Sequence, residues 1–311
     1  RMLKKHVIAV CLIAASTLLV YSNTFHSTFH FDDVEQIVEN SKIKDLSNLR
    51  EILNGQRGIA VATFAVNYAV GGLNVFGYHL VNILIHITNG ILVYFLIFLT
   101  LSLMGNPPLG NGGAGGFDGW SSRIAIYVAL IFIVHPVQTQ GVTYITQRME
   151  SLASLFYLLA LLLLISGARA KSLFTASLLY CGVLASYFLG FKSKEIVITL
   201  PAILFIYDLY FISSGNIKGL LKRWPLYLSL FILLLYLASK TMVPADAVNA
   251  IKGDAFSDVT NATAGFAVKE ITPGQYLLTQ FSVIMTYLRL LILPVKQNLD
   301  YDYAVSSSLF E

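Results

Sequence analysis

The chain has 311 residues, of which 56% are hydrophobic and only 12% are charged, and its net charge is +4. Soluble domains carry about 25% charged residues, and several apolar runs here approach the roughly 20 residues that cross a bilayer. A soluble globular protein is therefore excluded. Continuous rather than alternating apolar runs exclude a membrane β-barrel, and the lack of a dense basic patch argues against a nucleic-acid binder. The composition predicts an all-α, polytopic membrane helix bundle.

The first apolar run predicts a membrane span over about residues 7–22. Lys4 and Lys5 precede this run, and cytoplasmic segments are enriched in lysine and arginine. We therefore expect the N-terminus in the cytoplasm, with the first span retained rather than cleaved as a signal peptide. An outer loop over about 23–77 then follows.

This outer loop begins with three acids within four residues, Asp32, Asp33 and Glu35. Such acids either solvate a loop beside a helix or supply a base at the mouth of a membrane-embedded site. Further along, Asp45 or Ser47 is expected to cap a short amphipathic helix. The apolar stretch at 58–70 is too short to span comfortably and ends at two glycines. It predicts a surface or re-entrant helix.

The second span, over about 78–103, carries four polar residues on one helical face: His79, Asn82, His86 and Asn89. Their spacing of three, four and three residues produces this alignment. Polar groups within a span normally face a bundle interior or a wet cavity. Hydrogen bonding between helices is the alternative purpose.

The remaining apolar runs predict five more spans and one run that either spans or re-enters. They lie at about 123–136, 143–166, 172–190, 196–213 and 225–241, with the last run at about 275–294. The total is seven or eight spans. A Gly-rich loop at 104–121 is expected in the cytoplasm and a polar loop at 242–274 outside. We expect one domain over 1–311.

On this topology, the outer ends of the spans gather acids from one loop and cations from several. The group comprises Asp32, Asp33, Arg57, His79, His135, Arg148, Lys192, Lys194 and Glu195. Lys192 and Lys194 lie outside, against the positive-inside rule, which indicates an anion-binding group or a surface pair neutralised by Glu195. A carboxylate base beside cations suits a reaction that releases an anionic group such as phosphate.

Several short motifs occur in a fixed order over nearly the whole chain. They are Phe31-Asp32-Asp33, Gly77-Tyr78-His79-Leu80-Val81-Asn82 with His86, His135-Pro136-Val137-Gln138-Thr139, Gln147-Arg148-Met149-Glu150-Ser151-Leu152, Lys194-Glu195, Tyr276-Leu277-Leu278-Thr279-Gln280, Tyr287-Leu288-Arg289-Leu290 and Leu299-Asp300-Tyr301-Asp302-Tyr303. In this order the chain resembles bacterial relatives of the transmembrane and tetratricopeptide-repeat-containing protein O-mannosyltransferases, in the GT-C class of membrane glycosyltransferases.

The resemblance implies a GT-C-like transferase that moves a sugar from a polyprenyl- or dolichyl-phosphate donor to a Ser or Thr hydroxyl of an exported protein, with inversion. It implies that the Asp32/Asp33 pair holds the catalytic base. Arg148, Lys194 and Arg289 would hold the donor phosphate. His79, His135 and Glu195 would position the sugar or the acceptor.

The same resemblance implies no required cofactor, although Asp32 and Asp33 leave a divalent metal ion possible. The expected partners are membrane lipid, the polyprenyl-phosphate sugar, the exported acceptor and subunits of a membrane complex, and no nucleic acid. The expected location is a bacterial inner membrane, with the active site on the non-cytoplasmic side.

Two departures from the family pattern leave alternatives open. The chain reads Arg57-Gly58-Ile59 where family members often carry Arg-Pro-Leu, and the tetratricopeptide repeats are expected to be absent. A non-catalytic GT-C-like scaffold is therefore the main alternative. It predicts that Asp32 and Asp33 face a closed surface, whereas an enzyme needs an open outer cavity. A transporter is less favoured, because the polar residues lie on one side and no inverted repeat is found.

Overall fold

The computed structural model describes residues 2–104, 116–241 and 272–298, together with 301, 303–306 and 308. The contacts divide the chain into two compact units, Arg1–Ser239 and Lys240–Glu311, and each is described by itself. The predicted single domain stays a prediction. Of the predicted loops at 104–121 and 242–274, residues 105–115 and 242–271 lie outside the described residues, whereas 116–121 belong to a helix (Gly116–Val134) rather than to a loop.

The described segments are helical, in agreement with the predicted all-α membrane bundle. The long and medium helices are α1 (Met2–Val20), α3 (Gly58–Gly71), α4 (Val75–Met104), α5 (Gly116–Val134), α7 (Arg148–Ala168), α8 (Leu173–Phe191), α9 (Leu200–Tyr207), α11 (Trp224–Thr241) and α13 (Pro273–Ile292). The short ones are η1 (Ser22–His26), η2 (Val34–Val38), η3 (Ser41–Lys44), η4 (Leu46–Asn48), α2 (Leu49–Asn54), η5 (Pro136–Gln138), α6 (Thr139–Thr143), η6 (Ile145–Gln147), η7 (Glu195–Thr199), η8 (Asp208–Ile212) and α10 (Ile217–Leu221).

Most predicted spans match helices to within about five residues, but α5 begins at Gly116 rather than at about residue 123. In the described part of the chain, five helices are long and apolar enough to cross a membrane, and the α5–α6 pair, bent by 51°, makes a sixth if it is one span. The bend follows His135-Pro136, where the sequence predicts the end of the third span. Since α11 falls among the shorter apolar helices, the count of seven or eight spans stays a prediction.

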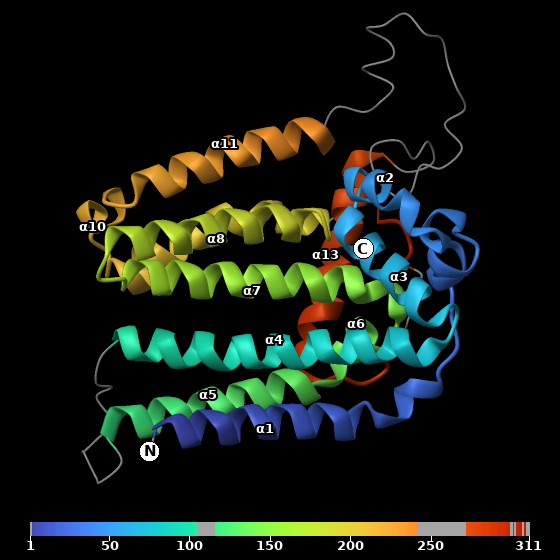
Figure 1. The fold of residues 1–311 in the computed structure, drawn as a ribbon, viewed down its shortest axis with the longest axis horizontal. Helices are drawn as coiled ribbons and strands as arrows, with labels where there is room; N and C mark the ends of the chain where they lie inside the picture. The colour runs from blue at the N-terminus through green and yellow to red at the C-terminus, as the bar shows by residue number, and fades with distance from the viewer. Residues whose placement is uncertain are drawn as a thin grey trace, which may run out of the picture. The chain divides into compact units, whose positions relative to one another are not determined.

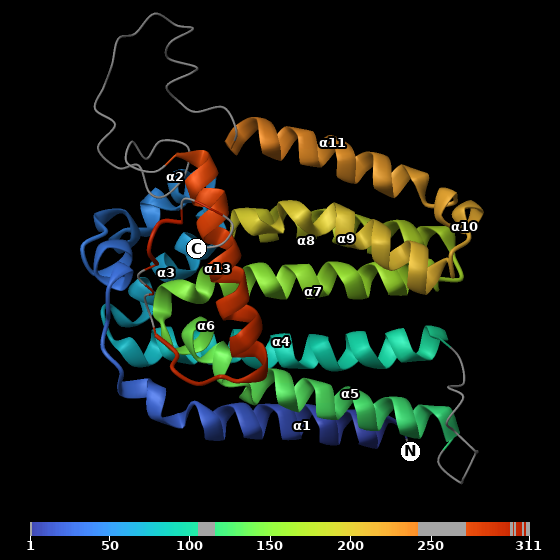
Figure 2. The same ribbon diagram turned by 180° about the vertical axis from the view of Figure 1, so that it is seen from behind.

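The long helices of the first unit run side by side, in the order α1, α5, α4, α7, α8 and α11 (Figure 1, Figure 2). The short helices α2, α3 and α6 gather at the end where α4 and α7 begin. The chain's N-terminus and α10 lie at the opposite end. This arrangement brings the predicted outer loop and the α5–α7 and α8–α9 connections to one end of the bundle.

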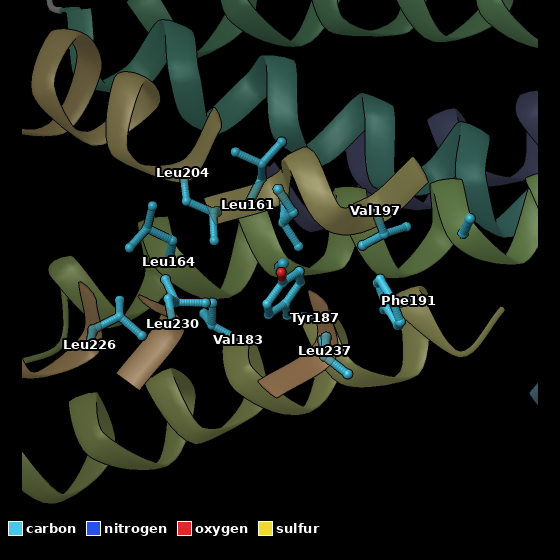
Figure 3. Packing of buried hydrophobic residues seen from close by; sticks show 13 residues of the cluster. Leu161, Leu164, Val183, Tyr187, Phe191, Val197, Leu204, Leu226, Leu230 and Leu237 are labelled. Carbon is cyan, nitrogen blue, oxygen red and sulfur yellow. The ribbon is translucent and has the colours of Figure 1, made fainter. Parts of the chain in front are cut away.

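Apolar side chains fill the seams between these helices. The largest cluster joins α7, α8, α9 and α11, with Leu164, Tyr187 and Leu204 fully buried at its centre (Figure 3). A second cluster joins the first loop to α3, α4 and α7, around Ile43, Phe64 and Tyr78. The first loop is therefore packed onto the bundle by its own buried core rather than loosely attached to it.

The four polar residues of the second predicted span do share one buried face of α4. The His79 ring meets the carbonyl of Ser27 at 2.9 Å, and the His86 ring meets that of Ile133 at 3.1 Å. The Asn89 side chain donates to the carbonyl of Ser151 at 2.9 Å. This face therefore joins α4 to its neighbours by hydrogen bonds. Of the two roles that the sequence left open, hydrogen bonding between segments fits these residues better than lining a wet cavity.

Candidate functional site

Asp33 joins the first loop to the segment that precedes α7. Its carboxylate accepts the backbone N–H of Thr146 at 2.8 Å and that of His30 at 3.2 Å. The side chain is only 1% exposed. Burial raises the pKa of Asp33, and the two backbone N–H donors partly offset this effect. Asp33 therefore fastens the loop and faces protein rather than an open space.

Asp32, the other member of the doublet, is exposed and lines a pocket of about 140 Å³. The Asp32 backbone N–H donates to the Tyr144 hydroxyl at 3.0 Å, which fixes the turn that presents the carboxylate. The other lining residues come from the first loop, the start of α7 and the α8–α9 connection: Gln36, Arg57, Thr146, Gln147, Met149 and Lys194. The doublet therefore supplies one carboxylate to the pocket.

Two cations face this pocket, and each is paired with an acid. Lys194 contacts the carboxylate of Glu150, and Arg57 donates to Glu195 at 3.1 Å. The side chains of Lys194 and Arg57 are 24% and 43% exposed, so these pairs are partly solvated. Partly solvated ion pairs contribute little to stability. An entering anion can compete for both cations at modest cost.

The α8–α9 connection is held against the α2–α3 junction. The Lys192 ammonium donates to the carbonyls of Asn54 at 3.2 Å and Gly55 at 2.5 Å. The backbone N–H of Ile59 donates to the carbonyl of Lys192 at 3.1 Å. These bonds fix the distance between the loops that carry Arg57 and Lys194, so the two cations belong to a preformed site.

Strained backbone occurs on both sides of the pocket. Phe31 precedes Asp32 with φ +46°, and Arg57 lines the pocket with φ +52°. This region costs a non-glycine residue roughly 1–2 kcal/mol, and such strain is concentrated at functional sites. The next residue, Gly58, packs so closely that an added Cβ would lie 2.4 Å from the carbonyl oxygen of Ile52. A Cβ at position 58 therefore needs a shift of the surrounding backbone.

Arg148 lies beside the pocket but does not line it. The side chain is 0% exposed, and its guanidinium donates to the side chains of Asn82 (2.7 Å), Asn67 (2.6 Å) and Thr63 (3.2 Å). It also donates to the carbonyl of Tyr78 at 2.9 Å. Arg148 thus joins α7 to α3 and α4, and this buried position does not bring it to the pocket with Lys194.

Within the first unit, His79, His135 and Glu195 are not among the residues that line the pocket. The His79 ring is 0% exposed, and His135 accepts the backbone N–H of Val137 at 3.1 Å as the cap of η5. Glu195 reaches the site through Arg57. Arg289 lies in the last turn of α13, in the second unit. The structure thus brings Asp32 and Lys194 to one pocket, and the predicted roles of the others stay predictions.

The pocket fits a divalent metal ion poorly. In the described ranges, no three His, Cys, Asp or Glu side chains come together as a ligand set. Both Asp33 oxygens already accept backbone N–H groups, so Asp32 remains the one carboxylate of the doublet available to a ligand. Hard divalent ions take six or more oxygen ligands. A single available carboxylate falls short of that ligand set.

Several lining residues were not predicted as site residues. Arg57 was noted only for its charge, and Gln147 and Met149 flank Arg148 within a recognised motif. The charge of Arg148 suggested a site residue, but its buried position is not evident from the sequence. For Gln36 and Thr146 the sequence offers no signal, since a polar residue in a loop is ordinarily solvated.

The chain is similar to curated protein O-mannosyltransferases. It is 27% identical to Protein O-mannosyl-transferase TMTC4 of Homo sapiens over 234 residues, 69% of this chain and 31% of that protein. It is 28% identical to Protein O-mannosyl-transferase TMTC2 of Homo sapiens over 258 residues, 74% of this chain and 28% of that protein.

Protein O-mannosyl-transferase Tmtc3 of Drosophila melanogaster is 26% identical over 259 residues, 75% of this chain and 26% of that protein. The chain spans less than a third of the length of these curated relatives. No family model matches the chain, and no solved structure matches it. The resemblance to the transmembrane and tetratricopeptide-repeat-containing protein O-mannosyltransferases is confirmed by these similarities, while the GT-C class stays a prediction.

Proposed function

We propose that the Asp32 pocket is the active site of a glycosyltransferase. The enzyme moves a sugar from a polyprenyl-phosphate donor to a Ser or Thr hydroxyl of an exported protein, with inversion. One observation carries the proposal: an exposed carboxylate and two cations in partly solvated ion pairs line one pocket in a membrane helix bundle. The names of the curated relatives, all protein O-mannosyl-transferases, support the reaction class.

In the proposed step, the acceptor oxygen attacks the anomeric carbon of the donor sugar. A new carbon–oxygen bond forms, the bond from the anomeric carbon to the phosphate oxygen breaks, and polyprenyl phosphate leaves with the electron pair. The acceptor proton passes to the Asp32 carboxylate. A single displacement of this kind inverts the anomeric centre. Asp32 suits the role of base because a base must reach the proton it removes, and Asp33 is buried against backbone donors.

Lys194 and Arg57 stabilise the phosphate as negative charge develops on the leaving oxygen. Before the donor binds, Glu150 and Glu195 hold these two cations in place. The phosphate then competes with the two carboxylates for the cations. We assign Arg148 to the packing of the first loop instead, because its guanidinium is fully buried and engaged by neutral acceptors.

The distribution of basic residues supports an outward-facing pocket. The end of the bundle opposite the pocket carries the N-terminus, the α7–α8 connection and α10 (Figure 1). These three segments carry basic residues and no acid: Lys4, Lys5, Arg169, Lys171, Lys218, Lys222 and Arg223. The pocket end also carries basic residues, but there they are interspersed with acids; the basic ones are Lys42, Lys44, Arg50, Arg57, Lys192 and Lys194. By the positive-inside rule the end opposite the pocket faces the cytoplasm, and the pocket then faces the side where an exported protein is met. A bacterial inner membrane remains the proposed location.

An exposed Asp32 favours the enzyme over the non-catalytic scaffold, which predicts that both aspartates are enclosed. The test is transfer by the purified protein in lipid vesicles, with polyprenyl-phosphate mannose as donor and short synthetic peptides with one central Thr as acceptors. Mannosylated peptide supports the proposal. Intact donor and unmodified peptides across the panel, with correctly folded protein, favour the scaffold.

A further inference from the structure

Phe31 stands out in the turn that presents Asp32. Its side chain is 65% exposed, whereas Phe29, two residues earlier, packs edge-on against Tyr78 with ring centroids 5.5 Å apart. Phe31 is not among the residues that line the pocket. A large aromatic side chain therefore projects outward directly beside the proposed catalytic base.

The backbone at Phe31 is both strained and rigid. Its φ of +46° lies in the left-handed region, where glycine or asparagine fits at lower cost. The turn is closed by the Asp33 N–H donating to the carbonyl of His30 at 2.9 Å, and the Val34 N–H donates to the carbonyl of Phe31 at 3.0 Å. The strained conformation is thus held firmly, and the outward side chain gives the folded protein little packing in return.

We propose that Phe31 is an acceptor-positioning residue, whose ring packs against the polypeptide that carries the reacting hydroxyl. This inference rests on the proposed function. In that reaction the donor sugar occupies the pocket, and the acceptor must approach Asp32 from outside it. A residue that adjoins Asp32, stays out of the pocket wall and is exposed meets the acceptor rather than the sugar. Rigid aromatic anchors of this kind dominate many protein–peptide contacts.

The competing explanation is that Phe31 anchors the loop in the membrane surface, as interfacial aromatic residues do. Its position favours the acceptor. A lipid anchor gains nothing from a strained backbone adjoining Asp32, whereas an acceptor contact needs a fixed distance to the base. The two explanations also predict different kinetics. Loss of an acceptor contact raises the acceptor KM, whereas loss of a membrane anchor affects the lipid-linked donor.

The test compares Phe31→Gly with the parent protein in vesicles, using polyprenyl-phosphate mannose and the central-Thr peptides. Glycine suits the positive φ, so the variant is expected to fold with an undiminished melting temperature. The acceptor KM should rise about tenfold, as for loss of an aromatic anchor, while the donor KM and kcat stay within about twofold. Leu46→Ala, at a residue of the same loop that is 46% exposed, is the matched control and should change neither KM.

An unchanged acceptor KM overturns the proposal. If the donor KM rises at the same time, Phe31 is assigned to the membrane surface instead. A second arm needs no turnover. Binding of the fluorescently labelled peptides is measured on Asp32→Asn protein with and without Phe31→Gly. Weaker binding in the double variant supports the inference even if the parent protein transfers no sugar. Equal binding, or no peptide binding to Asp32→Asn protein, contradicts it.

Discussion

The carboxylate of Asp33 accepts the backbone N–H of Thr146 at 2.8 Å, across 113 positions of the sequence. This bond joins the first loop to the segment that leads into α7. The two aspartates of the doublet therefore have different positions: Asp33 holds the loop, and the neighbouring Asp32 lines the pocket. Two adjacent carboxylates of identical chemistry thus have different environments, and variants at the two positions should fail in different ways.

Asp33 should give the protein a specific pH dependence. Because burial raises its pKa above the ordinary 3.8, the folded state binds this proton at a higher pH than the unfolded state. The stability from this proton is fully present below about pH 3.8 and is lost as pH rises through the folded pKa. The melting temperature of the wild type relative to Asp33→Asn should therefore rise as pH falls from neutral towards 4. The expectation is contradicted if the melting temperature of the wild type minus that of Asp33→Asn stays constant with pH, or if it increases as pH rises.

Arg148→Gln should destabilise the protein strongly. The substitution removes the donors that satisfy Asn82, Asn67 and the carbonyl of Tyr78 in a buried site. Buried acceptors left without partners cost about 1–3 kcal/mol each, so the free energy of unfolding should fall by about 3 kcal/mol or more. Arg50→Gln, at an exposed arginine of α2, should change it by about 0.5 kcal/mol at most. An unaltered melting temperature with lost donor binding would return Arg148 to the phosphate site.

Lys194→Ala should weaken donor binding more than it slows the bound reaction. A charge-assisted hydrogen bond contributes about 1.5–3 kcal/mol, so the donor KM should rise about tenfold or more while kcat changes less. Lys42→Ala is the control, because Lys42 pairs with Glu51 on the loop surface and lies outside the pocket wall. A large fall in kcat with an unchanged donor KM would move Lys194 away from the ground-state phosphate contact.

Gly58→Ala should destabilise the α2–α3 junction. The new Cβ would lie 2.4 Å from the carbonyl oxygen of Ile52 and 2.7 Å from that of Leu53, and both atoms belong to the backbone. Overpacking of this kind costs about 1–3 kcal/mol, which should appear as a lower melting temperature. Gly71→Ala, at the other end of α3, would place its Cβ 3.9 Å from Asn74 and serves as the control. Equal melting temperatures for the two variants would contradict the prediction, because the backbone at the α2–α3 junction would then accommodate the added Cβ at little cost.

Hydropathy in the sequence was enough to predict the bundle. Spans of apolar residues predicted α1, α4, α7 and α8 closely, because the membrane demands long uninterrupted apolar helices. The sequence also predicted a short helix capped by Asp45 or Ser47. In the structure, the Asp45 carboxylate accepts the N–H of Ser47 at 2.8 Å and caps η4, which leads into α2. The run η7–α9–η8 was predicted as one span, and Glu195–Ile212 is indeed long and apolar enough to cross a membrane, although hydropathy does not reveal its local changes of helix type.

The candidate site was predictable only in part. Charge and family motifs identified Asp32 and Lys194, which do share a pocket. The same signals could not separate Asp32 from Asp33, or the buried Arg148 from the half-exposed Arg57, because exposure depends on which loop packs over which helix. The buried state of His79 and Asn82 likewise follows from contacts distant in sequence, such as the carbonyls of Ser27 and Val142.

The most direct measurement is sugar transfer by Asp32→Asn protein in vesicles, compared with the wild type and with Glu35→Gln. Glu35 is an exposed carboxylate three residues from Asp32 and outside the pocket wall. The account predicts that Asp32→Asn lowers the rate about 100-fold or more, as expected for loss of a general base, with an unchanged melting temperature, and that Glu35→Gln keeps full activity. Wild-type rates from a folded Asp32→Asn protein would contradict the assignment of this pocket as the active site.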